Sequence, residues 1–309
     1  MFSIVIPIFN KEPHLRRSIG SVLHQTYPYF ELLLVDDGST DGCLSIAESI
    51  SDERVRVLKR LVPGPGGYAA RNLGIKVAKY DWVAFLDADD EWALDRLEKL
   101  TALIQKFPDA KILSSGWSEY FNERRSNLDD FSQKYQSCPP SYFDIFTLLL
   151  DKQPICTSVA IIRKQLLIEV NGFDESWNRG ADLELWLRLL LTGAKGAWLN
   201  EVTAIYYKNA TNMVTLNPAS TDFPVFSTIK RSLGERIDKN LQIALKKFNN
   251  RINYGLTKGL LVKNKKYRKA FLRNFYFDLR VLNHVYVASL CIFIFPSRIT
   301  RRLIEQKVL

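Results

Sequence analysis

The first 115 residues alternate between short apolar runs and segments that repeat apolar residues at helical spacing. The runs "SIVIPIF" (3–9) and "ELLLVDD" (31–37) are almost continuously apolar, as strands buried on both faces are. Residues 13–25, between them, have the spacing of an amphipathic helix. Two further helices and two further strands are expected at residues 40–51, 69–80, 54–60 and 81–90. This alternation predicts an α/β fold with a mainly parallel, Rossmann-like sheet flanked by helices.

Acidic residues follow two of the predicted strands. Asp36 and Asp37 end one strand, and Asp87, Asp89 and Asp90 follow another. Because ligands of such sheets bind beyond the carboxyl ends of the strands, both acidic groups are expected at the binding edge. Carboxylates this close repel one another unless a cation lies between them. A Mg²⁺ or Mn²⁺ ion, shared with a phosphorylated ligand, is the cofactor that this pattern predicts.

A glycine-rich loop, "PGPGG" (63–67), leads into the helix that carries Arg71. Its backbone N–H groups and the planar guanidinium of Arg71 are suited to binding phosphate. Residues 64–69 also fit the G-x-G-x-x-A pattern of dinucleotide-binding folds. That pattern belongs in the first strand-to-helix turn, where this chain has "IPIFNKEPHL" instead. An NAD-dependent enzyme is therefore disfavoured.

Three motifs together resemble a known family. "SIVIPIFNKEPHLRRSIGSVLHQTYPYFELLLVDDGSTDG", "GGYAARNLGI" and "AFLDADDEW" are similar, in order and spacing, to the nucleotide-sugar-binding half of inverting glycosyltransferases of family two, which have the GT-A fold. The likeness continues through "NRGADLELWLRLLLTG" (178–193). It implies a metal-dependent enzyme that moves one sugar from a nucleoside-diphosphate sugar, with UDP favoured, to an acceptor hydroxyl. The implied acceptor is a glycan or a lipid-linked glycan in the assembly of bacterial lipopolysaccharide, capsule or exopolysaccharide.

The resemblance also implies roles for individual residues. The expected nucleotide-sugar-binding residues are Pro7, Phe9, Asp37, Arg71 and Asp87. Asp89 is the expected direct metal ligand, with Asp87 as a second ligand and Asp90 as a helper. Asp182, in "RGADLELWLRLL", matches the general base that removes the proton of the acceptor hydroxyl.

Several of these residues have a structural alternative. Asp36 and Asp37 are alternatively turn residues, since Asp and Gly dominate turns for backbone reasons. Asp182 is alternatively the N-cap of the helix that follows it. Glu184 and Arg188, at i and i+4 in that helix, are expected to form a pair on the surface.

Two departures from the family pattern are the basis of an alternative function. Ala181 precedes Asp182 where many relatives have Glu, and no histidine occurs near residue 210. Lys208 or Asn212 is the expected substitute for that histidine. The alternative function is a catalytically silent nucleotide-sugar-binding or scaffold protein. The Q-x-x-R-W motif of processive synthases is also absent, which favours transfer of a single sugar.

The resemblance and the charge divide the chain into two parts. Residues 1–218 are expected to form the GT-A domain, with a nucleotide-sugar half (1–115) and an acceptor half (116–218). Residues 219–309 are expected to form a basic helical region. From residue 221 onward, 19 Lys and Arg face 5 Asp and Glu, a net charge of +14, whereas the preceding residues carry 24 minus 28, or −4. Such asymmetry points to an anionic partner of the C-terminal region.

The C-terminal region combines basic and aromatic residues. Residues 267–282 are expected to form an amphipathic helix whose apolar stripe is Phe271, Phe275, Leu279 and Leu282. This composition favours an anionic membrane surface, which would bring the site to a lipid-linked acceptor. The alternative is a set of solvated helices that pack on the catalytic domain. Nucleic acid is not expected as a partner, because no zinc-finger, RNP or helix-turn-helix pattern accompanies the charge.

Cysteine usage and apolar runs bear on localisation. The four cysteines are far apart and have no C-x-x-C spacing, which argues against a zinc site and a disulfide framework (Cys43, Cys138, Cys156 and Cys291). The longest apolar run, residues 285–295, is shorter than the roughly 20 residues that a spanning helix needs. The N-terminus has no basic segment before its apolar run. These features predict a cytoplasmic protein, peripheral on the inner face of the plasma membrane if the C-terminal region binds lipid.

Overall fold

A computed structural model describes most of the chain. The described residues are 1–121, 124–211, 222–263, 271–278 and 280. The chain divides into two compact units, the first formed by Met1–Leu148 with Lys152–Leu216 and the second by Leu149–Asp151 with Asn217–Leu309. The boundary expected between residues 218 and 219 stays a prediction.

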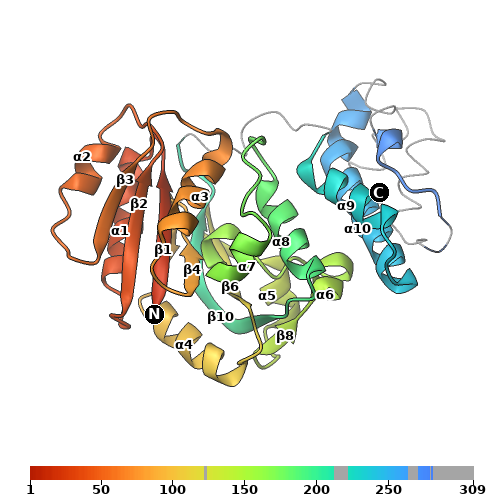
Figure 1. The fold of residues 1–309 in the computed structure, drawn as a ribbon, viewed down its shortest axis with the longest axis horizontal. Coiled ribbons are helices and arrows are strands. Elements are labelled where there is room, and N and C mark those ends of the chain that lie inside the picture. The colour runs from red at the N-terminus through yellow and green to blue at the C-terminus, as the bar shows by residue number, and fades with distance from the viewer. Residues whose placement is uncertain (122–123, 212–221, 264–270, 279, 281–309) are drawn as a thin grey trace. The chain divides into compact units, whose positions relative to one another are not determined.

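Within the described residues of the first unit, ten strands form one sheet (Figure 1). They are β1 (Phe2–Ile8), β2 (Phe30–Asp36), β3 (Val55–Lys59), β4 (Trp82–Phe85), β5 (Glu91–Trp92), β6 (Ile112–Phe121), β7 (Arg124–Leu128), β8 (Ser141–Phe143), β9 (Ile161–Arg163) and β10 (Gly196–Tyr207). The main path through the sheet has the order β3-β2-β1-β4-β9-β6-β10-β5. Strands β7 and β8 pair with β6 and β10 at the side of this path.

Helices connect these strands. The helices up to residue 191 are α1 (Glu12–Leu23), α2 (Cys43–Glu48), α3 (Tyr68–Val77), α4 (Arg96–Lys106), α5 (Asp130–Tyr135), α6 (Ile145–Leu150), α7 (Lys164–Glu169) and α8 (Ala181–Leu191). Two short 3₁₀ turns, η1 (Pro65–Gly67) and η2 (Thr157–Val159), precede α3 and β9.

The sheet is parallel in one half and mixed in the other. Strands β3, β2, β1 and β4 are parallel, which confirms the predicted α/β class and brings their carboxyl ends to one edge. Strand β9 is antiparallel to both β4 and β6, and thus joins the two halves of the sheet. This three-residue strand follows η2 directly, without the crossover helix that a parallel connection requires. The sheet is therefore more mixed than the sequence pattern predicts.

Helices cover both faces of the parallel half, with α1 and α3 on opposite sides (Figure 1). Alternate residues of β1 pack with one face of α1 in a single apolar cluster: Phe2, Ile4, Ile6 and Ile8 with Leu15, Ile19 and Val22. On the other face, a Cβ added at Gly74 of α3 would lie only 2.5 Å from a methyl carbon of Val5. Burial on both faces explains why these strands are apolar throughout rather than alternating.

The second unit contains α9 (Pro224–Gly234) and α10 (Lys239–Lys263). Three buried asparagines of α10 donate side-chain hydrogen bonds to the backbone of the segment from residue 271 to 276: Asn249, Asn250 and Asn253. Asn250 also accepts from the Tyr276 amide at 2.9 Å and donates to the Tyr276 carbonyl at 3.0 Å. The segment is helical at residues 271–273, and three of its carbonyls and the Tyr276 amide bond to asparagine side chains of α10.

This arrangement corrects the predicted amphipathic helix over residues 267–282. The helix is present at residues 271–273 but does not continue through residues 275–278, where both backbone groups of Tyr276 bond to the Asn250 side chain. Phe271 and Phe275 are nevertheless buried together, with ring centroids 5.2 Å apart. Leu279 and Leu282 lie outside the described residues.

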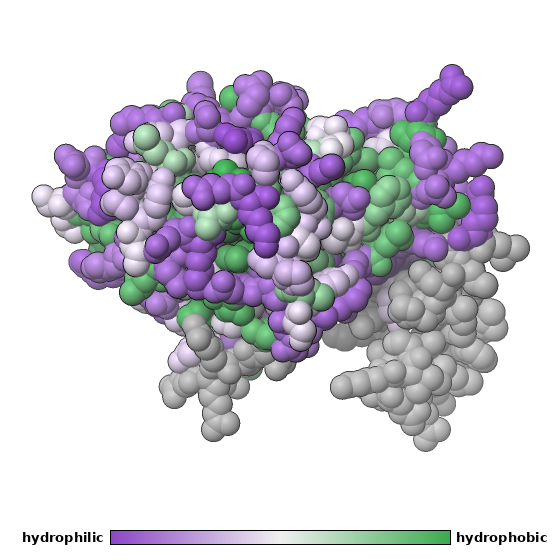
Figure 2. All heavy atoms as spheres, turned by 90° about the horizontal axis from the view of Figure 1, so that it is seen from below, coloured by the Kyte–Doolittle hydropathy of each residue, from purple (hydrophilic) through white to green (hydrophobic). Residues whose placement is uncertain are grey.

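The surface, the helix lengths and the cysteines of the described residues bear on the expected localisation. On the face drawn in Figure 2, hydrophilic and hydrophobic residues are interspersed. None of the described helices is both long enough and apolar enough to span a bilayer. Cys43, Cys138 and Cys156 have free thiols, whereas Cys291 and the apolar run at 285–295 lie outside the described residues.

Candidate active site

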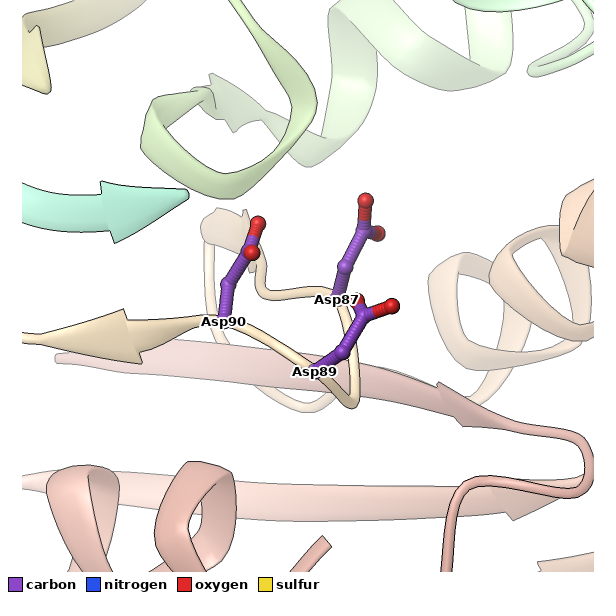
Figure 3. Close-up of side chains that lie close together, drawn as sticks. All are labelled: Asp87, Asp89 and Asp90. Carbon is purple, nitrogen blue, oxygen red and sulfur yellow. The ribbon is translucent and has the colours of Figure 1, made fainter. Parts of the chain in front are cut away.

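The turn after β4 carries three carboxylates. One oxygen atom each of Asp87, Asp89 and Asp90 lies within 4.8 Å of the others. Figure 3 shows that the three side chains project to the same side of the turn. The Asp87 side chain is 28% exposed and that of Asp89 is 12% exposed, whereas Asp90 is fully buried. The turn thus leaves the Asp87 carboxylate partly exposed, Asp89 slightly exposed and Asp90 in the interior.

Asp90 anchors the turn to the second half of the sheet. One of its oxygens accepts from the Ser158 hydroxyl in η2 at 2.5 Å, and the other accepts from the Tyr207 amide at the end of β10 at 3.0 Å. Burial, followed by the charges of Asp89 and Asp87, raises the pKa of Asp90 well above its ordinary value. With both oxygens engaged, Asp90 fixes the turn that carries the other two carboxylates.

Helix α1 holds the backbone of the same turn. Ser18 donates to the Asp87 carbonyl at 3.2 Å, and an Nη of Arg17 donates to the Asp89 carbonyl at 2.6 Å. The Arg17 guanidinium also lies 3.5 Å from the ring centroid of Tyr207, which is an arrangement for a cation–π contact. The carboxylates are therefore mounted on a backbone that three separate elements hold in place.

Each of the two expected metal ligands is paired with a cationic side chain. Arg71 donates to Asp87 at 2.5 Å, and the Lys11 ammonium donates to Asp89 at 2.6 Å. The sequence singled out Arg71 but not Lys11. Lys11 occurs in "FNKE", directly after the exit of β1 onto the edge where the acidic groups gather, and this position is the signal that points to it.

Arg71 is wedged into the protein. It is 7% exposed, and its guanidinium lies 5.7 Å from the ring centroids of both Tyr68 and Phe173. A second Nη donates to the Gly66 carbonyl at 3.0 Å. Gly66 has φ +65°, a conformation that glycine adopts without strain, so the loop folds back over the arginine. Arg71 thus links the glycine-rich loop to Asp87.

The acidic pair after β2 has a different environment. Asp37 is 1% exposed, pairs with Arg60, and accepts from the Gly64 amide with both oxygens at 3.2 Å. Burial raises the pKa of Asp37, and these two partners oppose the rise. Asp36 accepts from the Ser39 amide at 3.3 Å and is the residue of the pair that stabilises the turn. Asp37 instead fastens the glycine-rich loop to the sheet edge.

Pro7 and Phe9 lie at the exit of β1. A Cβ added at Gly67 would lie 3.6 Å from the Cβ atom of Pro7, so the glycine-rich loop passes directly over this proline. The Phe9 ring is left 45% exposed. An exposed aromatic ring at the binding edge is a suitable wall for a planar base.

Asp182 is the second residue of α8. The N-cap of this helix is Gly180, with φ +86°, so the alternative in which Asp182 caps the helix is wrong. Burial raises the pKa of Asp182, and the charge of Asp87 adds to the rise, while the Leu183 amide and Arg71 act against it. Asp182, Arg71 and Asp87 therefore belong to one electrostatic environment.

Tyr68 is a residue of this environment that the sequence did not single out. Its ring is stacked on Phe173, with centroids 5.6 Å apart and 20° between the planes. Burial and the charge of Asp182 raise the pKa of the Tyr68 hydroxyl, whereas Arg71 and the amides of Ala181 and Gly180 lower it. The hydroxyl thus reaches the start of α8. The sequence signal for Tyr68 is its position as the first residue of the helix that follows the glycine-rich loop.

The pair of Glu184 and Arg188 is not on the surface. The Glu184 side chain is 5% exposed, and Arg188 donates to it at 2.7, 2.8 and 2.9 Å. Arg188 also donates to the carbonyls of Val170 and Gly172, at 2.7 Å for Gly172. The helical spacing predicts the pair correctly, but the contact with residues 170–172 buries it.

Of the two residues expected to replace the missing histidine, only Lys208 lies within the described part of the chain. The Lys208 ammonium pairs with Glu119 at 2.5 Å, and Asn212 lies outside the described residues. A different histidine, His14 of α1, accepts a hydrogen bond from the Thr211 amide at 3.1 Å. The segment that ends at Thr211 is therefore held against the start of α1.

The donor set of this edge fits a hard divalent cation. Asp87 and Asp89 supply partly accessible carboxylate oxygens at close range, which are ligands that Mg²⁺ and Mn²⁺ prefer. Amide groups of the glycine-rich loop and the guanidinium of Arg71 lie on the same edge, and both are suited to phosphate. A partly buried carboxylate with a raised pKa, that of Asp182, completes the arrangement.

Comparison with known proteins gives consistent matches. Residues 3–170 match the family described as Glycosyl transferase family 2. The chain is 38% identical over 244 residues to the UDP-Glc:alpha-D-GlcNAc-diphosphoundecaprenol beta-1,3-glucosyltransferase WfgD of Escherichia coli, which is 78% of this chain and 88% of WfgD. It is 32% identical over 211 residues to the putative teichuronic acid biosynthesis glycosyltransferase TuaG of Bacillus subtilis, which is 67% of this chain and 78% of TuaG.

The fold matches a solved structure. S. aureus TarS 1–349 in complex with UDP-GlcNAc superimposes with a TM-score of 0.75 at 19% identity, over 97% of this chain and 87% of that one. This match shows the GT-A fold. The matched residues cover only 40% and 46% of the length of two other curated relatives.

Proposed function

Because this chain belongs to glycosyl transferase family 2, we propose that it is a metal-dependent inverting glycosyltransferase. It moves one sugar from a nucleoside-diphosphate sugar, with UDP favoured, to an acceptor hydroxyl in bacterial surface glycan assembly. The observation that carries the proposal is the grouping of Asp87 with Arg71 and, through its raised pKa, of Asp182 with both.

The side chains have separate roles in this reaction. Asp182 accepts the proton of the acceptor hydroxyl as that oxygen bonds to the anomeric carbon of the sugar. The bond from the anomeric carbon to the diphosphate oxygen breaks, its electron pair leaves with the nucleoside diphosphate, and the configuration at the carbon inverts. Arg71 stabilises the negative charge that develops on the diphosphate. Asp89 and Asp87 would hold a Mg²⁺ or Mn²⁺ ion, which when bound supplies further positive charge there.

The pKa of Asp182 supports its role as the base. A carboxylate with an ordinary pKa is a weak proton acceptor near neutral pH, and burial of Asp182 raises its pKa. Ala181, which stands where many relatives have a Glu, is fully buried, and the rise at Asp182 comes from burial and Asp87 instead. The missing acid is thus not needed for a raised pKa, which favours the enzyme over the catalytically silent alternative.

The relatives support the class of donor and acceptor. The printed name of WfgD gives a UDP-linked glucose as its donor and a diphosphoundecaprenol-linked sugar as its acceptor. The name of TuaG places it in teichuronic acid biosynthesis. By this analogy we assign the chain a UDP-linked donor and a lipid-linked glycan acceptor. Pro7, Phe9 and Asp37 are the residues proposed to face the nucleotide.

The test is release of nucleoside diphosphate from a panel of nucleotide sugars, with lipid-linked acceptors and Mn²⁺. Asp89→Ala and Asp182→Asn are expected to lower the rate by at least about a hundredfold, whereas only Asp89→Ala changes the Mn²⁺ dependence. Asp95→Asn is the control, because that side chain, at the N-cap position of α4, is 44% exposed, makes no capping hydrogen bond and pairs with Lys99. No metal-dependent release from any donor would leave the silent binding protein as the better assignment.

We also propose that the region from residue 219 to 309, with its charge of +14 from residue 221 on, binds anionic membrane at the cytoplasmic face. Flotation of the full chain with vesicles tests this. Binding to anionic but not neutral vesicles, weakened by salt, is the expected result. A chain that stays at the bottom of the gradient with anionic vesicles at low salt would instead favour helices that serve only to pack on the protein.

A further inference from the structure

The Lys11 ammonium is bound to the carboxylate of Asp89, the expected direct ligand of the metal ion. Its ammonium donates to one oxygen of Asp89 at 2.6 Å and to the Thr211 carbonyl at 2.6 Å. The side chains of the ion pair are 14% and 12% exposed, so both charges are largely withdrawn from solvent. In this state Asp89 is neutralised by a cation of the protein itself.

The backbone of Lys11 is fixed, whereas its side chain has a long stem. The Lys11 amide donates to the Cys43 thiol at 3.1 Å, and Lys11 is the N-cap residue of α1. Four methylene groups separate this anchored backbone from the ammonium, so the charge can change partners without movement of α1. The Lys11 ammonium is therefore a charge of the site that can move to another partner while its backbone stays in place.

Arg71, the other cation of the cluster, is not suited to such a change. Its guanidinium is buried between two aromatic rings and bonds to both Gly66 and Asp87. Arg17 is similarly committed to the Asp89 carbonyl and to the ring of Tyr207. His14, whose pKa is lowered by burial and by Arg17, accepts from the Thr211 amide and carries no comparable charge. Among the described cations around Asp89, Lys11 alone combines a bond to this carboxylate with a flexible stem.

We propose that Lys11 is the resident counter-ion of Asp89 and is transferred to the diphosphate of the donor when the metal ion binds. This inference rests on the proposed function. A divalent cation on Asp89 displaces the ammonium, because two cations on one carboxylate oxygen repel each other. The diphosphate brings negative charge to the same place, and the displaced ammonium then pairs with it. Lys11 therefore opposes binding of the metal alone and favours binding of metal and donor together.

Two opposite effects follow from removal of this charge. In Lys11→Met, which keeps an unbranched apolar stem, Mn²⁺ is expected to bind about tenfold more tightly in the absence of nucleotide, since one charge-assisted bond no longer competes. UDP, in the presence of saturating Mn²⁺, is expected to bind about tenfold more weakly for the same reason. A merely structural lysine would weaken both affinities or neither.

The experiment measures binding and not catalysis. Free Mn²⁺ is quantified by electron paramagnetic resonance, and UDP binding by calorimetry, for the full chain and for Lys11→Met. Lys11→Gln is the second variant, and thermal melting verifies that each variant is folded. Lys59→Met is the matched control, because Lys59 also pairs with a carboxylate, Glu48 at 2.5 Å, but at an exposed position on β3. Both affinities of this control are expected to equal those of the unaltered chain.

The outcomes separate this proposal from the proposed function. If the unaltered chain binds Mn²⁺ but the folded Lys11 variants bind it no more tightly, Lys11 does not compete for Asp89 and the inference is wrong while the metal site stands. If the variants bind UDP with Mn²⁺ as tightly as the unaltered chain does, the transfer to the diphosphate is wrong. If no form of the chain binds Mn²⁺, the metal site and this inference both fail.

Discussion

Replacement of Arg188 by Met is expected to destabilise the first unit far more than a helical surface pair would suggest. Arg188 joins α8, the helix that carries Asp182, to the loop at residues 170–172. Its removal takes away the cation that faces the Glu184 carboxylate, whose side chain is 5% exposed. Loss of one partner of such a pair costs about 3–5 kcal/mol of unfolding free energy.

The double variant provides the decisive comparison. In Arg188→Met with Glu184→Met both charges of the pair are removed, and the carbonyls of Val170 and Gly172 lose their donor at a cost of about 1 kcal/mol each. The double variant is therefore expected to be more stable than Arg188→Met alone by roughly 1–3 kcal/mol. Urea unfolding followed by tryptophan fluorescence measures these differences, since Trp186 in the same helix is fully buried.

An exposed pair serves as the reference. Lys59 and Glu48, with side chains 52% and 49% exposed, form an ion pair at 2.5 Å. Lys59→Met is expected to change the unfolding free energy by less than about 1 kcal/mol. If Arg188→Met costs no more than this reference, or if the double variant is as unstable as the single one, the reasoning from burial is refuted.

Three further predictions concern the site. The kcat/KM for sugar transfer should rise with pH through the pKa of Asp182, which lies above the ordinary 3.8. Arg71→Met should move this rise to higher pH, because it removes a positive charge that lowers the pKa of Asp182. A rise at the same pH in the variant contradicts this prediction. Folding raises the pKa of Asp90. The contribution of Asp90 to the free energy of unfolding is therefore complete below its pKa in the unfolded state and is lost as the pH rises through its pKa in the folded state. Asp90→Asn should abolish this slope in urea unfolding from about pH 4 to pH 8 with a chelator present, and an unchanged slope argues against Asp90 as its source. Gly66→Ala should lower the melting temperature, because a Cβ there would lie 2.7 Å from the Asn178 carbonyl oxygen at a φ of +65°; an unchanged melting curve would show that the loop relaxes freely.

The sequence predicts the parallel half of the sheet well because its strands are buried on both faces. Runs such as "SIVIPIF" and "ELLLVDD" can be satisfied only by a covered sheet, and the acidic residues at their ends mark its edge. Short strands in the mixed half of the sheet carry no such pattern. β9 has three residues and β5 has two, and both are defined by pairing with distant strands, which local periodicity does not encode.

The parts of the site that the sequence missed depend on tertiary contacts. Lys11 and Asp89 are 78 positions apart, and only the fold brings them to 2.6 Å. Helical spacing indicates that Glu184 and Arg188 meet, but it does not show that a loop covers them. In the second unit, the helical pattern fails at residue 276, because the buried Asn250 side chain offers both backbone groups of Tyr276 another set of hydrogen bonds.

The double anchorage of Asp90 sets a condition for recombining this enzyme class. The aspartate stands in the part of the chain that resembles nucleotide-sugar-binding sequences, whereas Ser158 and the Tyr207 amide, which bind it, belong to residues 116–218, the proposed acceptor half. A chimera that grafts a foreign acceptor portion must bring an equivalent hydroxyl and an equivalent strand end. Without them, Asp90 would lose both hydrogen bonds that fix the turn of Asp87 and Asp89, although the sequence of that turn is unchanged.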